Sequence, residues 1–428
     1  MIALNLPTLK FKIVINFLIS LLPLSFIAGN LVINLNITLI ILISLFFWKK
    51  EFFNIKINLI DKLLILLFIF SIITGLINYN SFLSNNPSLA KENLIKSFTL
   101  FRYLFFYFSI RLIIEKDYFN FKTFFLSSSI CVVFVSLDLI LQFYLGKDIF
   151  GYPKSDHKLS GPFGDELIAG SYLQRFSLFL FFFTYFYKKF SNKINLYSIL
   201  FFLFALVFFS VIIAGNRMST ILFVMMFVIL FLVEKKLRKF IVILIPLIFL
   251  VFFSLYNLYP YIQDTTNHFI KISSQIIFSF DQIFNSPDLN FSNMYLKEFH
   301  LGYMTWKENV LIGGGINSFY LNCEINYDIC TSHPHNYYFE ILSELGIIGM
   351  VLISTIFINL IYLFLKIKNN FTFNYNNYPI VVFASIFFVE IFPLKTTGSF
   401  FTTGNASYIF LLMAVVVGLS NKLGYYKI

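Results

Sequence analysis

The chain has 428 residues, of which 58% are hydrophobic and only 12% are charged, and its mean hydropathy is +0.81. A soluble protein of this length cannot bury so much apolar surface, so a soluble globular fold is excluded. The formal charge of +11 could indicate a nucleic-acid partner. However, the basic residues are scattered between apolar runs without forming a sustained patch, so we expect no nucleic acid to bind.

Apolar runs of about 20 residues recur along the chain, which is the length that crosses the roughly 30 Å hydrocarbon core of a bilayer as a helix. Lipid offers no partner to backbone N–H and C=O groups, so these runs must be helical. The sequence therefore predicts an all-α polytopic membrane protein with a single membrane domain over residues 1–428. We expect about twelve spans: 13–28, 31–48, 62–79, 98–114, 123–145, 167–187, 195–214, 217–233, 240–259, 337–365, 378–394 and 405–421.

Most lysines and arginines fall in alternate connections between these spans. The positive-inside rule places those connections, and with them both termini, in the cytoplasm. The long polar loop 260–336 then lies on the opposite, extracytoplasmic face. Within that loop we expect short helices lying on the membrane around 266–284 and 294–310, followed by a glycine turn.

Six ionisable residues fall in, or just beyond, the outward halves of their spans. Charges within a bilayer are costly and usually face a cavity or a partner. Their clustering on one side favours a polar chamber open to the extracytoplasmic face, although each side chain could instead extend its charge to the interface. These residues are Arg102, Asp138, Arg175, Arg217, Glu390 and Lys395.

A histidine-rich stretch stands where the outer loop re-enters apolar sequence. It reads Ser332-His333-Pro334-His335-Asn336, and nine residues later comes Gly346-Ile347-Ile348-Gly349. An imidazole titrates near neutrality, so His335 can take a proton from an acceptor hydroxyl. Asn336 can orient that ring or cap the next helix, and the two glycines let another helix approach closely. The alternative is a helix cap followed by a packing motif.

This stretch resembles the signature of the O-antigen ligase family, which is His, then Asn, Ser or Gln, nine residues, and Gly-x-x-Gly. Three other stretches resemble family motifs: Ser160-Gly161-Pro162-Phe163, Gly215-Asn216-Arg217-Met218-Ser219, and Trp306 through Gly313-Gly314-Gly315 to Phe319. The family and the related O-antigen polymerases are multispan inner-membrane glycosyltransferases with one large periplasmic loop late in the chain. The resemblance implies the same architecture here.

The resemblance also implies an activity: transfer of a glycan from an undecaprenyl-diphosphate donor to a sugar hydroxyl, with lipid A–core as the favoured acceptor. The reaction would take place at the periplasmic face of the bacterial inner membrane. His335 would be the general base, while Arg217 and Arg175 would bind the diphosphate and stabilise its growing charge. We expect inversion at the anomeric carbon, and neither a metal nor another cofactor.

The sequence departs from the family pattern at two cations. The family usually carries an arginine a few residues before the tryptophan, and here Lys297, His300 or Lys307 would have to supply that charge. An arginine often precedes the Ser-Gly-x-Phe stretch, and here Lys158 stands near that position. Lysine does not replace the bidentate contact of arginine. With Asn336 and Arg102, the residues Lys158, Lys297 and His300 complete the predicted substrate-binding set.

Two cysteines, Cys323 and Cys330, flank six residues of the outer loop just before the histidines. Outside the cytoplasm a disulfide is the favoured interpretation. A zinc site that also uses His333 and His335 is the weaker alternative, because the cysteine spacing is wide and an oxidising compartment disfavours thiolates.

Other functions remain open at this stage. An O-antigen polymerase or a protein glycan ligase of the same family would share these motifs. From another class, a transporter or flippase for a lipid-linked sugar would also span the membrane. Transporters often show internal repeats and broken helices near mid-membrane, whereas here we find no convincing repeat and the polar residues gather toward one face.

Overall fold

The computed structural model describes residues 6–84, 87–155, 158–183, 193–285, 291, 293–320, 323, 331–369, 378–396 and 398–424. Over these ranges the regular structure is α-helical apart from short 3-10 turns and one isolated bridge. The predicted all-α fold class is confirmed. Eight helices in these ranges are long and apolar enough to cross a membrane, and three further apolar helices are shorter.

Each of the twelve predicted spans overlaps a helix within the described ranges, although the span 378–394 extends beyond a helix that ends at Glu390 and the span 98–114 crosses the break between helices ending at Thr99 and starting at Phe101. The predicted number of about twelve membrane-crossing helices stays a prediction. The outer loop also contains helices near the predicted positions: α12 (Pro260–Phe278), α13 (Gln282–Asn285) and α14 (Met294–Glu308). The chain as described folds into two compact units, each assembled from three separate segments. The prediction of one membrane domain over residues 1–428 stays a prediction.

Unit 1 comprises Met1–Ile43, Lys116–Ile270 and Phe373–Val389. Its helices are α1 (Leu6–Ala28), most of α2 (Asn30–Trp48), α7 (Phe121–Leu145), α8 (Ala169–Phe183), α9 (Lys193–Ile213), α10 (Arg217–Val233), α11 (Arg238–Leu258), the first part of α12, and α17 (Tyr378–Glu390). Within this unit α7 packs against α1, α8 and α9, and α8 also packs against α10.

Phenylalanines form the core where α7, α8 and α17 meet. The ring of Phe179 lies 5.1 Å from that of Phe124 and 5.0 Å from that of Phe383, measured between centroids. Tilted and edge-on aromatic pairs at this spacing are favourable beyond the area that they bury. The many phenylalanines of the sequence therefore have a packing role in this unit.

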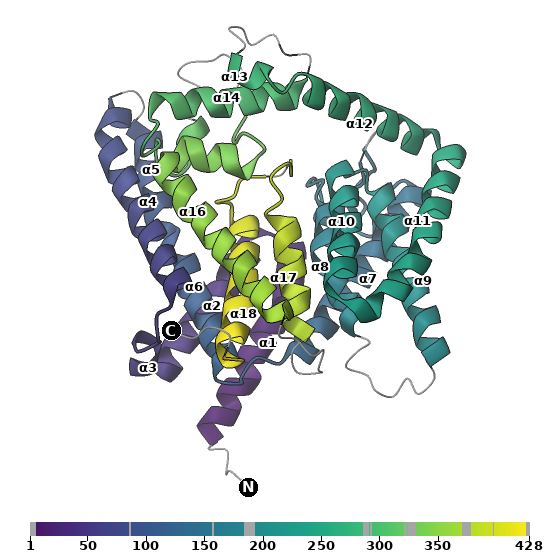
Figure 1. The fold of residues 1–428 in the computed structure, drawn as a ribbon, viewed down its shortest axis with the longest axis horizontal. Coiled ribbons are helices and arrows are strands. Elements are labelled where there is room, and N and C mark those ends of the chain that lie inside the picture. The colour runs from purple at the N-terminus through teal and green to yellow at the C-terminus, as the bar shows by residue number, and fades with distance from the viewer. Residues whose placement is uncertain are drawn as a thin grey trace. The chain divides into compact units, whose positions relative to one another are not determined.

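Unit 2 comprises Ser44–Glu115, Lys271–Thr372 and Glu390–Ile428. Its helices are α3 (Lys50–Phe53), α4 (Leu59–Leu83), α5 (Pro87–Thr99), α6 (Phe101–Glu115), α13, α14, α16 (Tyr337–Asn369) and α18 (Thr403–Lys422). In Figure 1, α14 lies over the N-terminal end of α16, and α16 packs along α4. The buried helix α18 packs on α6, where Gly418 leaves room for Ile114.

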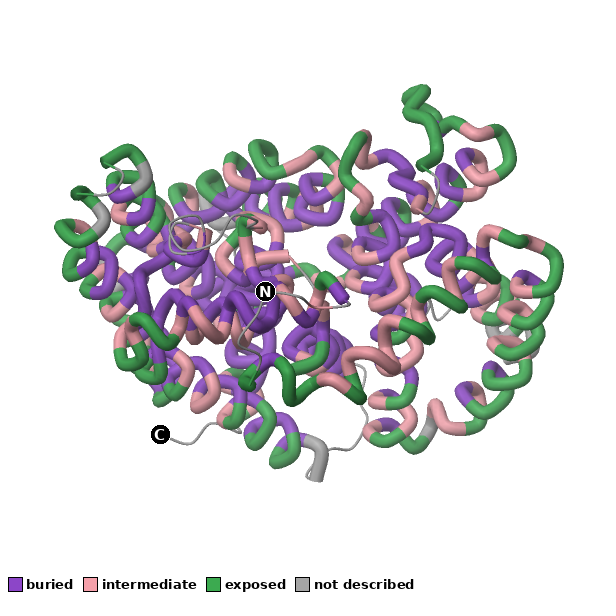
Figure 2. Tube along the Cα trace, turned by 90° about the horizontal axis from the view of Figure 1, so that it is seen from above, coloured by how far each residue is buried: buried purple, intermediate pink, exposed green. Residues whose placement is uncertain are grey.

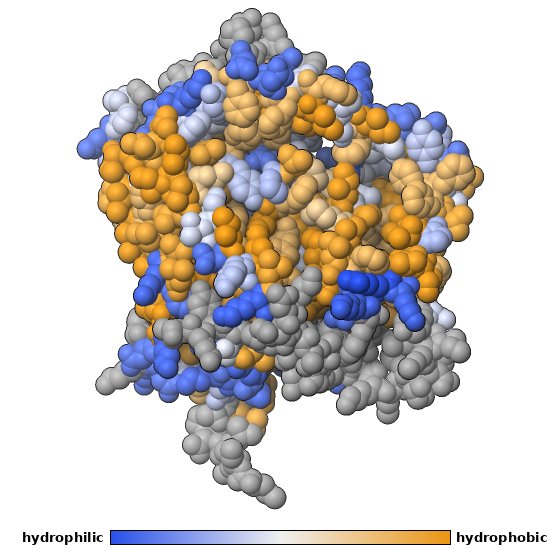
Figure 3. All heavy atoms as spheres, viewed as in Figure 1, coloured by the Kyte–Doolittle hydropathy of each residue, from blue (hydrophilic) through white to orange (hydrophobic). Residues whose placement is uncertain are grey.

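The helix α4 shows how membrane helices distribute their apolar residues. Its exposed residues Leu66, Ile69, Ile73 and Leu76 recur every three or four positions and form one stripe, whereas Leu64, Leu67 and Phe68 are buried. Figure 2 shows buried and exposed residues alternating in this way around the helical turns, and the visible face over α4 is hydrophobic in Figure 3. An apolar exposed stripe is expected for a helix that faces lipid.

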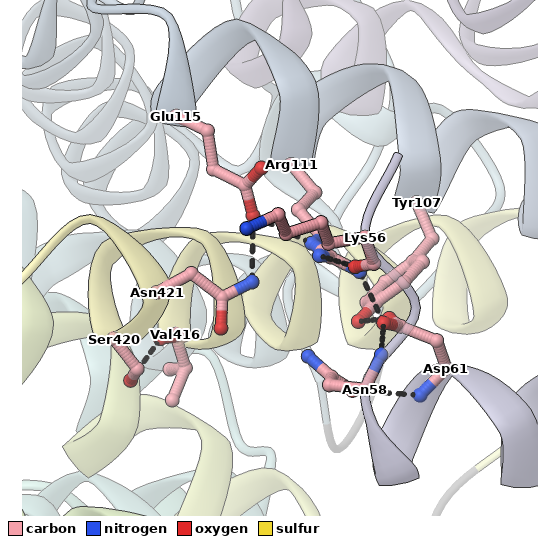
Figure 4. A network of polar contacts seen from close by, with 9 residues as sticks. All are labelled: Lys56, Asn58, Asp61, Tyr107, Arg111, Glu115, Val416, Ser420 and Asn421. Atoms are coloured by element: carbon pink, nitrogen blue, oxygen red, sulfur yellow. Dashed lines mark hydrogen bonds and ion pairs between the residues drawn. The ribbon is translucent and has the colours of Figure 1, made fainter. Parts of the chain in front are cut away.

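A buried ionic network joins the start of α4 to α6 and to the end of α18 (Figure 4). The guanidinium of Arg111 pairs with the carboxylates of Asp61 and Glu115, and both residues of the Arg111–Asp61 pair are at most 1% exposed. Tyr107 donates a hydrogen bond to Asp61 (2.7 Å), and Asn421 donates one to Glu115 (2.6 Å). The sequence groups Arg111 with the cations of a cytoplasmic connection, whereas its side chain is buried within unit 2.

Candidate functional site

In unit 1 the structure assembles two of the motifs noted in the sequence. The 3-10 turn at Gly161–Phe163 follows a backbone hydrogen bond from Leu159 N–H to the carbonyl of Ala214 (3.2 Å). Gly161 and Gly215 both adopt positive φ, of 54° and 73°, a conformation that glycine adopts without strain. The Ser-Gly-Pro-Phe turn and the turn before α10 are therefore neighbours.

The side chain of Asn216 fixes the second turn to the start of α8. Its Oδ1 accepts a hydrogen bond from Gly170 N–H (3.3 Å), and its Nδ2 donates to the carbonyl of Leu167 (2.9 Å). A Cβ added at Gly170 would lie 2.8 Å from the Cβ of Asn216, so only glycine fits there. The hydroxyls of Ser171 and Ser219 also hydrogen-bond at 3.0 Å. Arg217, at the first position of α10, is held at this junction.

A second cation accompanies Arg217. Burial lowers the pKa of the Lys158 ammonium, and the neighbouring Arg217 guanidinium lowers it further. Two cations held near each other in a partly buried place are electrostatically unfavourable until an anion joins them. The positive charge of Arg217 also acts on the phenol of Tyr261 and favours its ionised form. Burial is the larger effect and raises the pKa of Tyr261. This junction suits an anionic group, and sequence reasoning had not selected Tyr261.

The predicted cation Arg175 lies on α8, one helical turn beyond Ser171. Residues four apart share one face of a helix. Because Ser171 contacts Ser219, Arg175 lies on the side of α8 that carries the contact to α10. Its guanidinium is half-buried. The predicted role of Arg175 in binding substrate stays a prediction.

In unit 2 the glycine segment Gly313–Gly315 and the Gly-x-x-Gly stretch form one contact. Gly346 interrupts α16 with φ 61° and ψ −166°, and a Cβ there would lie 2.4 Å from the carbonyl carbon of Leu311. Backbone hydrogen bonds run from Gly315 N–H to the Glu344 carbonyl (2.8 Å) and from Ile347 N–H to the Val310 carbonyl (3.0 Å). The close approach expected at these glycines is present, but a loop makes it and not a helix.

Amides from two other helices hold the same glycine segment. Asn78 of α4 donates a hydrogen bond to the carbonyl of Gly313 (3.0 Å), and Asn93 of α5 donates to that of Gly314 (3.3 Å). Glycine backbone that is buried needs such partners for its polar groups. Neither asparagine was selected from the sequence, because each lies far along the chain from the glycines.

The histidine stretch is fixed at the start of α16. Asn336 caps the helix, because its Oδ1 accepts hydrogen bonds from the N–H groups of Tyr338 (2.9 Å) and Phe339 (3.3 Å), and its Nδ2 donates to the Pro393 carbonyl (2.8 Å). The predicted cap is thus present. Just before it, His335 adopts φ 49°, a left-handed conformation that is uncommon for residues other than glycine and is often found at functional sites.

The imidazole of His335 faces a carboxylate that sequence reasoning missed. Its Nε2 lies 3.6 Å from Oε1 of Glu298, and the two side chains are 35% and 5% exposed. Burial raises the pKa of Glu298 to about 7. The sequence did hold a signal for this residue: Glu298 shares a helical face with Leu301, Gly302 and Thr305, all of them buried.

His333 lies against His335, with 4.3 Å between the ring centroids. Burial, and then the neighbouring His335, lower the pKa of His333 to about 4, so this imidazole is neutral at physiological pH. Its Nδ1 contacts the hydroxyl of Ser332 at 2.8 Å. A neutral ring beside His335 leaves the latter as the member of the pair that can acquire charge.

The other predicted residues of unit 2 lie in separate places. His300 is buried, with its Nδ1 2.8 Å from the Ile283 carbonyl, and residues 298 and 300 point to different sides of α14. Lys297 is half-buried on the same helix. Arg102 donates hydrogen bonds to the hydroxyls of Tyr103 (2.7 Å) and Thr403 (3.3 Å). The substrate-binding roles of these three residues stay predictions.

Several of the charges expected to line a polar chamber have local partners. Glu390 accepts a hydrogen bond from the ammonium of Lys395 (2.6 Å) and one from the hydroxyl of Tyr337 (3.1 Å). In unit 1, Asp138 accepts the N–H of Ile149 (2.8 Å). The chamber stays a prediction.

Cys323 is buried beside Leu301 and Phe319 and is disulfide-bonded, whereas Cys131 is a free thiol. The predicted partner Cys330 lies outside the described residues. No group of three or more metal-binding side chains occurs among the residues that the structure describes.

The helices and these two sites define a polytopic membrane protein with a cationic junction in one unit and a histidine–carboxylate pair in the other. Residues 201–354 match the model of the O-antigen ligase family, which confirms the resemblance seen in the sequence. The matched range contains Arg217, the outer loop, His335 and the Gly-x-x-Gly stretch. A comparison with curated proteins found no match. The family match supports an enzyme of the O-antigen ligase and polymerase group that acts in a membrane on lipid-linked glycan.

Proposed function

We propose that this protein is an O-antigen ligase-like glycosyltransferase. It would move a glycan from an undecaprenyl-diphosphate donor to a sugar hydroxyl of lipid A–core at the periplasmic face of the bacterial inner membrane. The observation that carries the proposal is the setting of His335: a family motif residue in a left-handed conformation, with a buried carboxylate facing its ring.

The donor would bind through its diphosphate in unit 1. Arg217 and Lys158 supply two neighbouring positive charges at a junction that glycines and Asn216 hold in place. Hydrogen bonds between cations and phosphate oxygens are stronger than neutral ones and gain further in a partly dehydrated site. Their contribution grows as the glycosidic bond breaks, because negative charge then accumulates on the leaving diphosphate.

The acceptor would be activated by His335. The imidazole takes the proton of the acceptor hydroxyl while the oxygen forms a bond to the anomeric carbon of the donor. The bond from that carbon to the phosphate oxygen breaks, and its electron pair leaves with the diphosphate. Attack from the face opposite the leaving group predicts inversion at the anomeric carbon.

The proposal is tested with purified protein, a lipid-linked glycan and lipid A–core as acceptor. His335→Ala should lower the rate of glycan transfer by at least about a hundredfold, which is the usual contribution of a general base. His268→Ala, at an exposed histidine of α12, is the matched control and should leave the rate unchanged. Normal transfer by correctly folded His335→Ala protein would remove His335 from the mechanism.

The lipopolysaccharide of a deletion strain separates the functions that share these motifs. Loss of long glycan from the core, with polymer accumulating on undecaprenyl diphosphate, identifies a ligase. A single repeat unit on the core identifies a polymerase. Accumulation of donor on the cytoplasmic side, together with no glycan transfer by the purified protein, would instead indicate a flippase.

A further inference from the structure

We infer that Glu298 is the positioning residue of His335: its buried carboxylate orients the imidazole and stabilises the imidazolium that forms when the acceptor hydroxyl loses its proton. The inference rests on the proposed function, because it requires His335 to be the base.

The packing of α14 on the start of α16 brings the two side chains together. A Cβ added at Gly302 would lie 3.0 Å from the Cβ atoms of both Pro334 and Phe339, so the helix lies directly on the segment that carries His335. Asn293 caps α14, accepting the N–H of Tyr295 at 2.9 Å. Glu298, one turn before Gly302 on the same face, is therefore fixed opposite the ring.

Burying the Glu298 carboxylate costs free energy unless a positive charge or hydrogen bonds compensate it. Its Oε1 faces His335 at 3.6 Å, and its Oε2 is buried with no hydrogen-bond partner in the described part of the chain. A buried carboxylate without compensation loses its solvation, which raises the pKa of Glu298 to about 7. A positive charge that appears on His335 during the reaction supplies the missing compensation.

Among the residues that the structure describes, no cation other than His335 forms an ion pair with Glu298. His333, from the same loop, remains neutral at physiological pH because its pKa is lowered to about 4. Tyr295, on α14, presents its ring edge-on to His335, with 6.3 Å between the centroids. Lys297 is the neighbouring cation on α14, and His300 faces the Ile283 carbonyl. The contact between His335 and Glu298 is thus the local acid–base pair.

The contact also selects the protonation pattern of the ring. A carboxylate facing Nε2 favours the tautomer that carries its proton on Nε2, which leaves the basic electron pair on Nδ1. When the acceptor proton arrives, the ring becomes an imidazolium and Glu298 remains a carboxylate. Glu298 therefore moves no proton itself: it holds the ring and stabilises its charge.

The test compares Glu298→Gln and Glu298→Asp with Glu308→Gln in the transfer assay. Glu308 lies on the same helix, ten residues further along, and its side chain is exposed. For Glu298→Gln we expect kcat to fall at least about tenfold with KM for the donor unchanged, since the lost interaction develops only in the transition state. Glu298→Asp should retain part of the rate, and Glu308→Gln all of it.

Two further readouts separate positioning from a purely structural role. In wild type, kcat should rise with pH as Glu298 ionises near pH 7 and as His335 becomes the free base. Glu298→Gln should change that profile, because only the ionisation of His335 then remains. On a His335→Ala background, adding Glu298→Gln should cost nothing more, because the carboxylate acts only through the ring.

The outcomes distinguish this inference from the proposed function. Wild-type kcat and pH profile in Glu298→Gln, together with loss of transfer in His335→Ala, would overturn the inference and leave the proposed function intact. Retained transfer in His335→Ala would overturn both. Should Glu298→Gln fail to fold, Glu298→Asp carries the test: a kcat and a pH profile equal to those of wild type would sink the inference.

Discussion

Gly346 lies so close to Leu311 that a Cβ built on the glycine would be 2.4 Å from the carbonyl carbon of the leucine. The contact joins two stretches that are 35 residues apart in the sequence, the glycine segment of the outer loop and the Gly-x-x-Gly stretch of α16. It also fixes the loop against the helix that begins just after His335. One glycine of each motif, Gly313 and Gly346, is thus explained by this backbone contact.

Gly346→Ala should therefore destabilise the protein strongly. The substitution adds a backbone clash to the strain of a glycine-only conformation, which by itself costs of order 1–3 kcal/mol. Gly29→Ala is the matched control, because Gly29 also has positive φ (97°) but open space around it. Thermal unfolding in detergent should show a much larger loss for Gly346→Ala. Equal losses would mean that the contact with Leu311 is unimportant.

Arg217→Lys should lower glycan transfer although the charge is kept. Lysine cannot make the two parallel hydrogen bonds of a guanidinium to phosphate oxygens. Loss of one charge-assisted hydrogen bond, of about 1.5–3 kcal/mol, predicts a fall in kcat/KM of roughly tenfold to a hundredfold. Arg238→Lys, at an arginine that binds the Phe231 carbonyl, should leave transfer unchanged. Full activity of Arg217→Lys would point to a membrane anchor.

Removal of the Arg111 side-chain charge should destabilise unit 2. Arg111→Met leaves the buried carboxylate of Asp61 without its cation, which typically costs about 3–5 kcal/mol. The double variant Arg111→Met with Asp61→Leu removes both charges and should recover much of the loss. Thermal unfolding of the two variants measures the difference. A double variant no more stable than Arg111→Met would show that the charge itself is not the cause.

Stability should depend on pH through Glu298. Its pKa is about 7 in the folded protein against an ordinary value of 4.5, so the folded state binds this proton more tightly than the unfolded chain does. The free energy of unfolding therefore falls as pH rises between those values. Glu298→Gln removes the dependence and should be more stable than wild type at pH 8, by at most about 3 kcal/mol, but not at pH 4.

The contribution of His333 to the pH dependence of stability should have the opposite sign. Its pKa falls from 6.5 to about 4 on folding, so the unfolded chain binds this proton more tightly. The stability is fully present above pH 6.5 and is lost as the pH falls toward 4. Wild type should lose stability over that window relative to His333→Gln. Parallel unfolding curves for the two proteins across the window would contradict the burial of this imidazole.

The sequence by itself determined the helices of this protein and its resemblance to the O-antigen ligase family. Apolar runs of membrane length must be helical in lipid, so each predicted span overlaps a helix, and the local motifs around Arg217 and His335 suffice for the resemblance that the match over residues 201–354 confirms.

Only the tertiary structure decided which residues accompany those motifs. Glu298, Asn78 and Asn93 lie far along the chain from the groups that they contact or face, and a one-dimensional pattern does not specify which helices become neighbours. That choice depends on side-chain packing at places such as Gly302 and Gly346, where the absence of a Cβ lets two backbones meet. The close packing at Gly302 also places the buried carboxylate of Glu298, and not an arginine, opposite His335.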